Sequence, residues 1–407
     1  MAEDPALESV DSFQQRVREW LPGNMPRRSE EAGNEGNVIQ QARELQRKLW
    51  DGGFAGVLFP KEYRGLGLTL AHSRAFQEAA AEYQLPNYFA VTLGMIAPTL
   101  LDFGTEEQKQ RHIPAMLRSE EVWLQLLSEP TNGSDLAGAT MRATRDGDTF
   151  VLNGSKIWTS GADHSDYGMC LARTDWDVPK HPGLTMFLVP LRAPGVTIEP
   201  IRIISGAKGF CQEFFDDVVI PADSIVGGEG NGWSVASKLL IHERNTYGGA
   251  GLDGGLMGPS SRVQREDNIA ALARQRGLAG DTRVRQLIGE AHVLQTVAGH
   301  LTRHVGAGMR RGKLPGPAGS MLKLFTATSG YRRGELSMQI AGSDAVAWRE
   351  GEVGAGRFGQ SWLSIRSGST ASGTNEIQRN IISKRVLGLP REPQLDKDVP
   401  FSKVRKN

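Results

Sequence analysis

The spacing of apolar residues changes twice along this chain and divides it into three regions. Over residues 1–122 the apolar positions recur with the helical period, as in "NVIQQARELQRKLWDGGF", which stops at the glycine pair that begins with Gly52. A second helix is expected over "SRAFQEAAAEYQLP", ended by Pro86, and a third begins with a capping box formed by Thr105 and Gln108. We therefore expect an N-terminal helical domain.

Residues 123–230 show a different pattern, with short runs of branched and aromatic residues separated by Gly and Pro, such as "DYGMCLART", "GLTMFLVPL" and "EFFDDVVIP". The stretch "TFVLNGSKIWTSGA" reads as two short strands joined by a hairpin at Asn153 and Gly154. This region is predicted to be a small antiparallel β-sandwich or barrel.

The helical period returns at Trp233 and continues through residues 231–407. Long helices are expected over "WSVASKLLIHERNTYGG", "VRQLIGEAHVLQTVAGHLTRHVGAGMRRG", "PAGSMLKLFTATSGYRRGELSMQIAG" and "GTNEIQRNIISKRVLGL". Long helices with short connections are typical of a helical bundle. The whole chain is thus predicted to have an α+β fold.

Composition excludes several classes of protein. The 407 residues include 47 basic and 46 acidic ones, a balance that disfavours a nucleic-acid binder or a polybasic membrane protein. The two cysteines, Cys170 and Cys211, cannot form a disulfide framework or a four-thiolate metal site. The acidic N-terminus is unlike a secretory signal, and no apolar run is long enough to span a membrane. A cytoplasmic protein is expected.

Two flexible segments are expected between these elements. "SEEAGNEGN", residues 29–37, reads as a mobile loop. "GGAGLDGG" matches a dinucleotide-binding fingerprint through Gly249, Gly251 and Gly254, but that fingerprint requires a preceding strand. Because a helix precedes it here, we interpret it as a glycine-rich connector.

Two glutamates are candidates for chemistry. Glu376 lies in a first helical turn, three residues before Arg379, where a carboxylate complements the helix dipole. Glu243 falls on an apolar stripe with Ala236 and Leu239, and a carboxylate that loses solvation becomes more basic. Helix geometry alone favours a glutamate at the edge of the core that pairs with a cation, and leaves a role as a base open.

Several motifs occur in an order that resembles one family. They are "EYRGLGL" at Glu62, "SEPTNGSD" at Ser128, "LNGSKIWTSGA" at Leu152, "FDDVVIPADSIVGGEGNGW" at Phe215 and "GTNEIQRNIISKRVLGLPRE" at Gly373. Over nearly its whole length the chain resembles the acyl-CoA dehydrogenases. The resemblance implies an N-terminal helical domain, a middle antiparallel β domain and a C-terminal four-helix bundle.

The resemblance also implies FAD as the cofactor. The residues that would line the cofactor or the acyl-CoA are Gln125, Leu127, Ser128, Gly133 and Ser134. Those that would pack against the flavin are Trp158, Thr159 and Ser160. The adenosine-side phosphates and ribose would contact Thr374 and Glu376, and a neighbouring subunit's FAD would contact Gln339 and Gly342. In that last segment Ser343 and Ala345 replace glycines of the family pattern.

One departure from the family concerns the catalytic base. Many members carry it just before the "GT" of the last motif, where this chain has Ala371 and Ser372. A minority of the family carries a Glu-Arg pair on the first long helix of the C-terminal domain, and Glu243 with Arg244 matches that position. The resemblance therefore favours Glu243 as the base.

The resemblance implies an oxidoreductase that introduces an α,β double bond into an acyl-CoA and passes electrons to an electron-transfer flavoprotein. Fatty acyl, branched short-chain acyl and sterol side-chain substrates all remain open, and a homodimer or homotetramer is expected. Two alternatives keep the fold: a non-catalytic, FAD-sharing partner subunit of a heteromeric dehydrogenase, or a flavin monooxygenase or oxidase.

Overall fold

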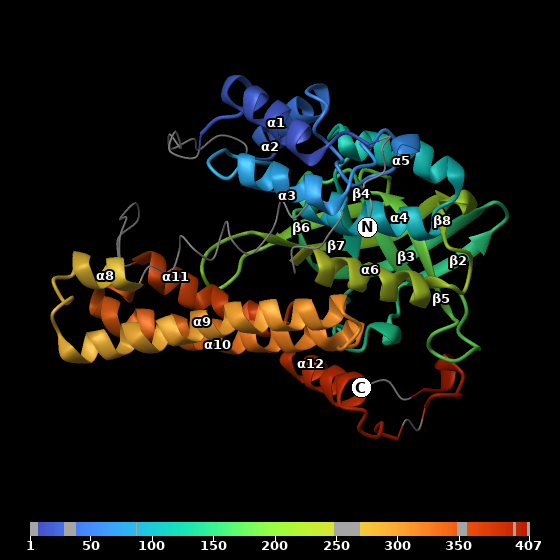
Figure 1. Ribbon diagram of the computed structural model, residues 1–407. Coiled ribbons are helices and arrows are strands. Elements are labelled where there is room, and N and C mark those ends of the chain that lie inside the picture. Colours follow the sequence, from blue (N-terminus) through green and yellow to red (C-terminus); the bar gives the residue numbers. More distant parts are fainter. Residues whose placement is uncertain are drawn as a thin grey trace. The chain divides into compact units, whose positions relative to one another are not determined.

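The computed structural model describes residues 7–27, 38–86, 88–247, 269–347, 356–393 and 396–404 (Figure 1). The chain divides into two compact units. Unit 1 comprises Met1–Arg202, Lys208–Gly258 and Leu395–Asn407, and unit 2 comprises Ile203–Ala207 and Pro259–Gln394. The loop predicted over residues 29–37 and the glycine-rich connector from Gly249 to Gly254 lie outside the described residues.

Unit 1 begins with helices, as predicted: α1 (Val10–Asn24), α2 (Val38–Asp51), α3 (Leu70–Ala79), α4 (Ala97–Phe103) and α5 (Glu106–Leu117). The end of α2 before Gly52 and the capping box of Thr105 and Gln108 at the start of α5 are confirmed. The helix predicted to run to Pro86 ends earlier. After α3 the chain becomes extended, and Tyr83 forms an isolated antiparallel β-bridge with Arg27. This pairing prevents the helix from continuing.

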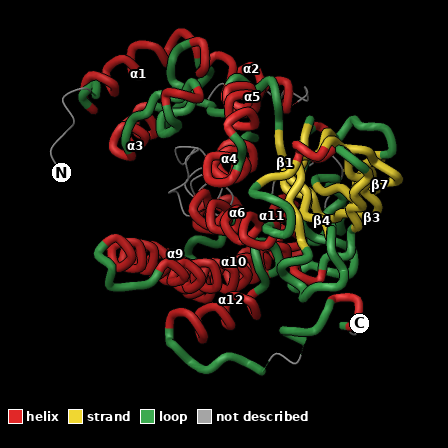
Figure 2. The backbone as a smooth tube through the Cα atoms, turned by 90° about the vertical axis from the view of Figure 1, so that its right-hand side faces the viewer, coloured by secondary structure: helices red, strands yellow, loops and turns green. Residues whose placement is uncertain are grey.

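The middle of the chain forms an eight-stranded sheet. Its strands are β1 (Trp123–Leu126), β2 (Arg142–Asp146), β3 (Thr149–Ser160), β4 (Tyr167–Arg173), β5 (Leu184–Pro190), β6 (Val196–Ile201), β7 (Phe210–Pro221) and β8 (Ile225–Val226). They run in the order β6-β7-β3-β2-β4-β5-β8, with β1 beside β4. The pairing is mainly antiparallel, but β1 and β2 each pair with β4 in parallel. Figure 2 shows these strands gathered in one body.

The hairpin predicted at Asn153 and Gly154 is wrong, because β3 runs through both residues as one strand of 12 residues. The turn lies earlier, between β2 and β3, where Gly147 has a φ of 57°. The Asn153 amide instead exchanges hydrogen bonds of 2.9 and 3.0 Å with Asp217 of β7. Gly154 lets β3 pass close to Met141, since a Cβ there would lie 3.0 Å from the Met141 Cα. A strand partner distant in sequence thus overrides the local turn signal.

Helix α6 (Gly232–Tyr247) follows the sheet where a helix was predicted, and it groups with unit 1. It packs against β5 and against a π-helical turn, Thr92–Ile96, that precedes α4. Ala236 and Leu239 are fully buried, which confirms the apolar stripe read from the sequence.

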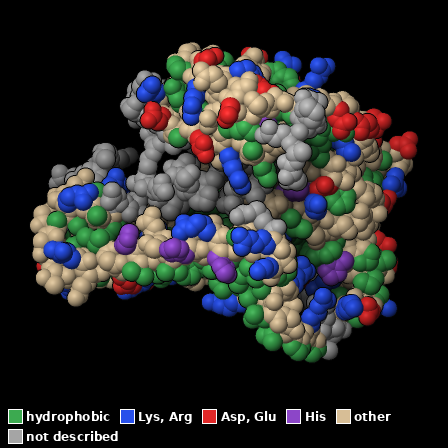
Figure 3. Space-filling model, in the orientation of Figure 1, with side chains coloured by type: hydrophobic (Ala, Val, Ile, Leu, Met, Phe, Trp, Pro, Cys, Tyr) green, Lys and Arg blue, Asp and Glu red, His purple; other side chains and the backbone are tan. Residues whose placement is uncertain are grey.

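Unit 2 contains α8 (Ile269–Gln275), α9 (Thr282–Arg310), α10 (Gly319–Ala341), α11 (Gly356–Ser364) and α12 (Asn375–Ile381). Helices α9 and α10 lie side by side (Figures 1 and 2). Leu336 and Ile340 of α10 are buried in the same core as Leu272 of α8. Figure 3 shows histidine and basic side chains along the outer surface of α9. The C-terminal region is helical as expected, and the boundaries predicted after residues 122 and 230 remain predictions.

None of the described helices combines the length and the apolar character that a bilayer span requires.

The C-terminal tail returns to the β-sheet of unit 1. Its 3₁₀ turn, Phe401–Lys403, is fixed by the Phe401 N–H, which donates to the Val178 carbonyl at 2.8 Å. The Phe401 ring is 3% exposed, and the guanidinium carbon of Arg173 lies 3.5 Å from the ring centroid. This cation–π contact with a fully buried arginine attaches the end of the chain to β4.

We predict that Phe401→Ala lowers the free energy of unfolding of unit 1 by about 3 kcal/mol, because it removes a buried aromatic ring and uncovers the Arg173 guanidinium. Lys403→Ala changes an exposed residue of the same turn and should have little effect. Urea denaturation of both variants measures the difference, and equal stabilities would contradict the role assigned to Phe401.

Candidate functional site

The loop from Ser128 to Asp135, which follows β1, is closed by its own backbone. Glu129 and Asn132 exchange backbone hydrogen bonds of 3.0 Å in both directions. The Ser128 carbonyl accepts a 2.9 Å hydrogen bond from the Ile157 N–H of β3. The loop is thereby fixed against the strand that carries Trp158 and Thr159.

A buried ion pair anchors this loop to β3. The Lys156 ammonium donates to the Glu129 carboxylate at 2.9 Å and to the Leu127 carbonyl at 3.1 Å. Glu129 also accepts from the Thr140 N–H and hydroxyl, both at 2.7 Å, and from the Met141 N–H at 2.9 Å. Burial opposes ionisation of Glu129, but the Lys156 charge and these donors outweigh it and hold the pKa of the carboxyl below its usual range.

A second acid, Glu213 of β7, faces the same ammonium. Glu213 pairs with Lys156 in the β3–β7 register, and both side chains are completely buried. Its Oε2 accepts a 2.8 Å hydrogen bond from the Thr159 hydroxyl, while its Oε1 has no hydrogen-bond partner among the described residues. Burial raises the pKa of Glu213 to about 7, although the Thr159 hydroxyl and the Lys156 charge act in the opposite direction.

Trp158 is the extra residue of a β-bulge. The β3–β7 register shifts between Ile157 and Thr159, so Trp158 has no partner on β7. Its φ is 66°, a left-handed conformation that is strained for a large side chain, and the residue is 56% exposed. The bulge therefore presents an indole on the surface of the sheet, beside Phe210, whose ring centroid is 6.1 Å away.

The other predicted residues near this bulge differ in burial. Leu127 and Thr159 are buried, Ser128 is half-buried, and Gly133, Ser134 and Ser160 are exposed. Gln125 of β1 is half-buried, yet its side-chain Oε1 is sealed from solvent and has no hydrogen-bond partner in the part of the chain that the structure describes. Such an atom is an acceptor available to a bound group.

Glu243 lies on α6 with 5% of its surface exposed, and its neighbour Arg244 is half-buried. The position of α6 is fixed by Thr246, whose hydroxyl donates to the Gly94 carbonyl at 2.8 Å. A Cβ at Gly94 would lie 2.5 Å from the Thr246 Oγ1, so only glycine permits this approach.

The π-helical turn that contains Gly94 also holds β1. The Thr92 hydroxyl accepts from the Trp123 N–H at 2.9 Å and donates to the Trp123 carbonyl at 3.0 Å. One irregular turn thus contacts both the helix of Glu243 and the strand of Gln125. π-Helical turns occur frequently at functional sites.

Four predicted residues lie in unit 2. Thr374 caps α12 by accepting from the Ile377 N–H at 3.2 Å. Glu376 is exposed and pairs with Arg379 at 3.2 Å; its own backbone N–H, with smaller contributions from Thr374 and Arg379, lowers the pKa of this carboxyl. The remaining two, at the end of α10, are exposed: Gln339 and Gly342.

Sequence reasoning missed Lys156, Glu213, Thr92 and Gly94. The first two had a signal, because inward positions alternate along β3 and β7 and a charged residue at an inward position is uncommon. The last two had none, since nothing in the local sequence distinguishes a π-helical turn from an α-helix.

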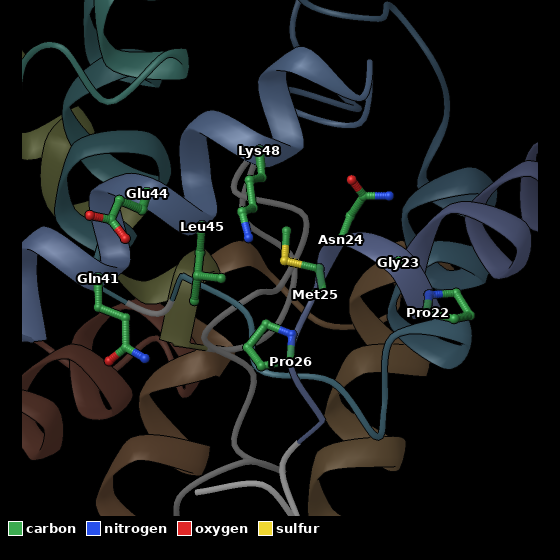
Figure 4. A pocket seen from close by; sticks show the side chains of 9 residues that line it. All are labelled: Pro22, Gly23, Asn24, Met25, Pro26, Gln41, Glu44, Leu45 and Lys48. Carbon is green, nitrogen blue, oxygen red and sulfur yellow. The ribbon is translucent and has the colours of Figure 1, made fainter. Parts of the chain in front are cut away.

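A separate hollow of about 340 Å³ lies between the end of α1 and α2 (Figure 4). Leu45 and Lys48 of α2 line it opposite Met25 and Pro26. None of the predicted site residues borders it.

We predict that Lys156→Met lowers the free energy of unfolding by about 3–5 kcal/mol, because it leaves the buried Glu129 carboxylate without its cation. Arg145→Met is the matched control: it breaks an exposed pair with Glu229 of similar length, 2.7 Å, and should cost less than about 1 kcal/mol. Chemical denaturation compares the two, and similar losses would show that burial of the Lys156 pair does not matter.

The raised pKa of Glu213 predicts that the stability of the fold depends on pH. The folded chain keeps the Glu213 proton up to about pH 7, because its pKa is raised to that value, whereas the unfolded chain releases the proton near 4.5, the ordinary pKa of a glutamate. The folded state therefore binds more protons in this window, and its stability falls as pH rises from about 4.5 to 7, by about 3 kcal/mol in total. Glu213→Gln cannot titrate, so its stability relative to wild type should rise by that amount between pH 4.5 and 8. Denaturation at several pH values tests this, and a constant difference would refute it.

Family models of known proteins match this chain in three consecutive regions, in the order read from the sequence. The family models for the N-terminal, middle and C-terminal domains of acyl-CoA dehydrogenase match residues 8–120, 125–218 and 230–387. The chain is 35% identical over 405 residues to acyl-CoA dehydrogenase IpdE1 of Mycobacterium tuberculosis, covering 95% of this chain and 99% of that one. It is 32% identical to acyl-CoA dehydrogenase FadE34 of the same organism, over 85% of this chain and 46% of that one.

Solved structures agree with this relationship. The "Tcur3481-Tcur3483 steroid ACAD" is 29% identical, with a TM-score of 0.75 over 96% of this chain and 100% of the matched chain. The ChsE4-ChsE5 complex from Mycobacterium tuberculosis is 25% identical, with a TM-score of 0.73 over the same shares. In fold, in the order of its domains and in sequence, this chain belongs to the acyl-CoA dehydrogenase family.

Proposed function

We propose that this protein is an FAD-dependent acyl-CoA dehydrogenase that forms an α,β double bond in a CoA thioester. The observation that carries the proposal is Glu243, a carboxylate with 5% exposure on the first long helix after the sheet. The alternative position for a base, just before Gly373, is filled by Ala371 and Ser372, which cannot accept a proton from carbon. Family membership supports the reaction class.

The residues around the bulge suit an isoalloxazine ring. Trp158 offers a flat apolar surface at a strained backbone position, and Gln125 offers a buried oxygen that lacks a partner among the described residues. A Cβ at Gly133 would meet no atom of the described residues within 4 Å, so the loop has free space beside this position. When bound, FAD accepts the hydride that leaves the β-carbon of the substrate. The adenosine end of FAD would be held by Thr374 and Glu376, and that of a neighbouring subunit by Gln339 and Gly342.

The proposed role of Glu243 is to take the α-proton of the thioester. A carboxylate removed from water is more basic than one on the surface, which suits the abstraction of a weakly acidic proton. Arg244, next to it, would orient the thioester or the acid. The fixed position of α6, held by the Thr246–Gly94 contact, keeps the base from moving when substrate binds.

We further propose a steroid-derived acyl-CoA as the substrate class and an electron-transfer flavoprotein as the acceptor. The similarity to a "steroid ACAD" and to the ChsE4-ChsE5 complex supports the first of these and favours a multi-subunit assembly. Val293 and Val297, which are 58% and 42% exposed one turn apart on α9, would be covered in such an assembly, whether homomeric or heteromeric.

Glu243→Gln should lower kcat by about 10²–10⁴-fold while FAD stays bound, because the amide keeps the shape of the acid but cannot take a proton. The measurement is bleaching of the flavin absorbance by a panel of fatty and steroid acyl-CoA thioesters. Glu229→Gln, which changes an exposed acid before α6, serves as the control.

Three other outcomes would revise the proposal. Unchanged turnover in Glu243→Gln would reject the base. Purification of the chain without FAD, with FAD bound only after a second subunit is added, would support the partner-subunit alternative. Fast reoxidation of the reduced flavin by air would support an oxidase.

A further inference from the structure

The bulge at Trp158 reverses the inward and outward faces of β3. Lys156 points into the sheet and its neighbour Ile157 is on the other side, paired with Gln212. Regular alternation would then bury Trp158 and expose Thr159. The structure has the opposite arrangement, because the inserted residue places Thr159 inside and leaves Trp158 outside.

The Thr159 hydroxyl donates a 2.8 Å hydrogen bond to the Glu213 carboxyl on the inner face of the sheet. This hydrogen bond joins two buried side chains, one on β3 and one on β7, beside the point where the register of the two strands shifts. If β3 were to lose the bulge, Thr159 would leave the interior and Glu213 would lose its donor. The hydrogen bond therefore favours the bulged register over the regular one.

We propose that Glu213 is a positioning residue of the flavin site, whose carboxyl keeps Thr159 on the inner face of the sheet and so holds Trp158 outward against the cofactor. The contact with the cofactor rests on the function proposed above, whereas the effect of Glu213 on Trp158 is a property of the chain alone. Glu213 acts through Thr159 and is not itself assigned a contact with substrate.

The surroundings of Glu213 make this positioning sensitive to pH. From β3 it is faced by Lys156, which already neutralises Glu129. From β4 and β7 the Cys170 and Cys211 thiols lie within its electrostatic reach, and burial raises the pKa of Cys170 to about 12 and also raises that of Cys211. The adjacent β6 contributes the apolar Ile198. The Asp163 carboxylate also lies near this layer, 3.8 Å from the Cys211 sulfur.

Lys156 pairs with Glu129, while for Glu213 its charge is outweighed by burial, so Glu213 is the acid that takes up a proton. Glu213 accepts one hydrogen bond from the described residues, whereas Glu129 accepts four, counting that from Lys156. With a pKa raised to about 7 by burial, Glu213 becomes charged as pH rises through neutrality. A new charge beneath the bulge should shift the environment of Trp158, and a nearby negative charge should disfavour reduction of a bound flavin.

The test uses the full chain labelled with 5-fluorotryptophan and observed by fluorine NMR. The chain has 8 tryptophans, and the Trp158 resonance is the one missing in Trp158→Phe. We expect this resonance to titrate with a midpoint near pH 7 in the wild type and to be flat in Glu213→Gln. The titration should persist in two controls: Asp216→Asn, an exposed residue of β7, and His164→Gln, which removes an imidazole from the 3₁₀ turn that follows β3.

A second pair of variants tests the hydrogen bond itself. Thr159→Val and Glu213→Leu should each displace the Trp158 resonance at every pH and raise the dissociation constant for FAD about tenfold, the effect of one lost hydrogen bond. Glu213→Gln keeps a hydrogen-bond acceptor and should bind FAD nearly as the wild type does. The reduction potential of its bound flavin should lack the extra decrease that ionisation of Glu213 causes near pH 7 in the wild type. Circular dichroism identifies any variant that fails to fold.

The proposal is overturned if the Trp158 resonance does not titrate in the wild type, if the titration survives in Glu213→Gln, or if Thr159→Val leaves the resonance and FAD binding unchanged. If the wild type shows the titration but binds no FAD, the proposed function fails and the positioning role stands. The two failures are therefore distinguishable.

Discussion

A single buried ammonium group, that of Lys156, determines how the candidate cofactor loop is held. It reaches the Glu129 carboxylate at 2.9 Å and the Leu127 carbonyl at 3.1 Å, both on the chain that follows β1. Neither an ammonium nor a carboxylate is stable in such a place alone, because burial without a partner costs several kcal/mol. The pair forms only when the loop and β3 pack together. The loop is consequently ordered by the folding of the sheet and not by the arrival of a ligand.

The bulge lies beside a second buried carboxylate, that of Glu213, which accepts a hydrogen bond from Thr159. Glu213 adds a second carboxylate to a layer that already has its charge balanced, and natural interiors tolerate such an excess mainly at functional sites. The hydroxyl that satisfies one of its oxygens comes from Thr159, and Thr159 can face inward only because Trp158 is inserted before it. The same β-bulge therefore determines both the hydrogen bond of the buried Glu213 and the exposure of the Trp158 indole.

The fold was largely predictable from the sequence because its helices have strong local signals. The end of α2 at Gly52 and the capping box at Thr105 follow from residues a few positions apart. The hairpin expected at Asn153 failed because its amide bonds to Asp217, 64 positions away, and local rules do not include such a partner. At the site, too, features with a local sequence signal could be predicted and features that depend on distant contacts could not. Motifs identified Trp158 and the loop, but the bulge that exposes the indole and the π-helical turn near α6 depend on pairing between distant segments.

The loop is also held from its outer side, by contacts that begin at the far end of the chain. Phe401 covers the guanidinium of Arg173, which donates to the Ala137 and Ala139 carbonyls at 2.8 and 3.0 Å, just beyond the loop. Lys180 lies 3.0 Å from both Asp135 and Asp396 and so connects the loop to the tail a second time. With Lys156 on one side and Arg173 and Lys180 on the other, the loop has little conformational entropy to lose when a ligand binds. Since affinity and rate both suffer when a binding loop must be ordered on contact, a loop fixed in advance from two directions suits a site that must hold a flat cofactor and a thioester in register.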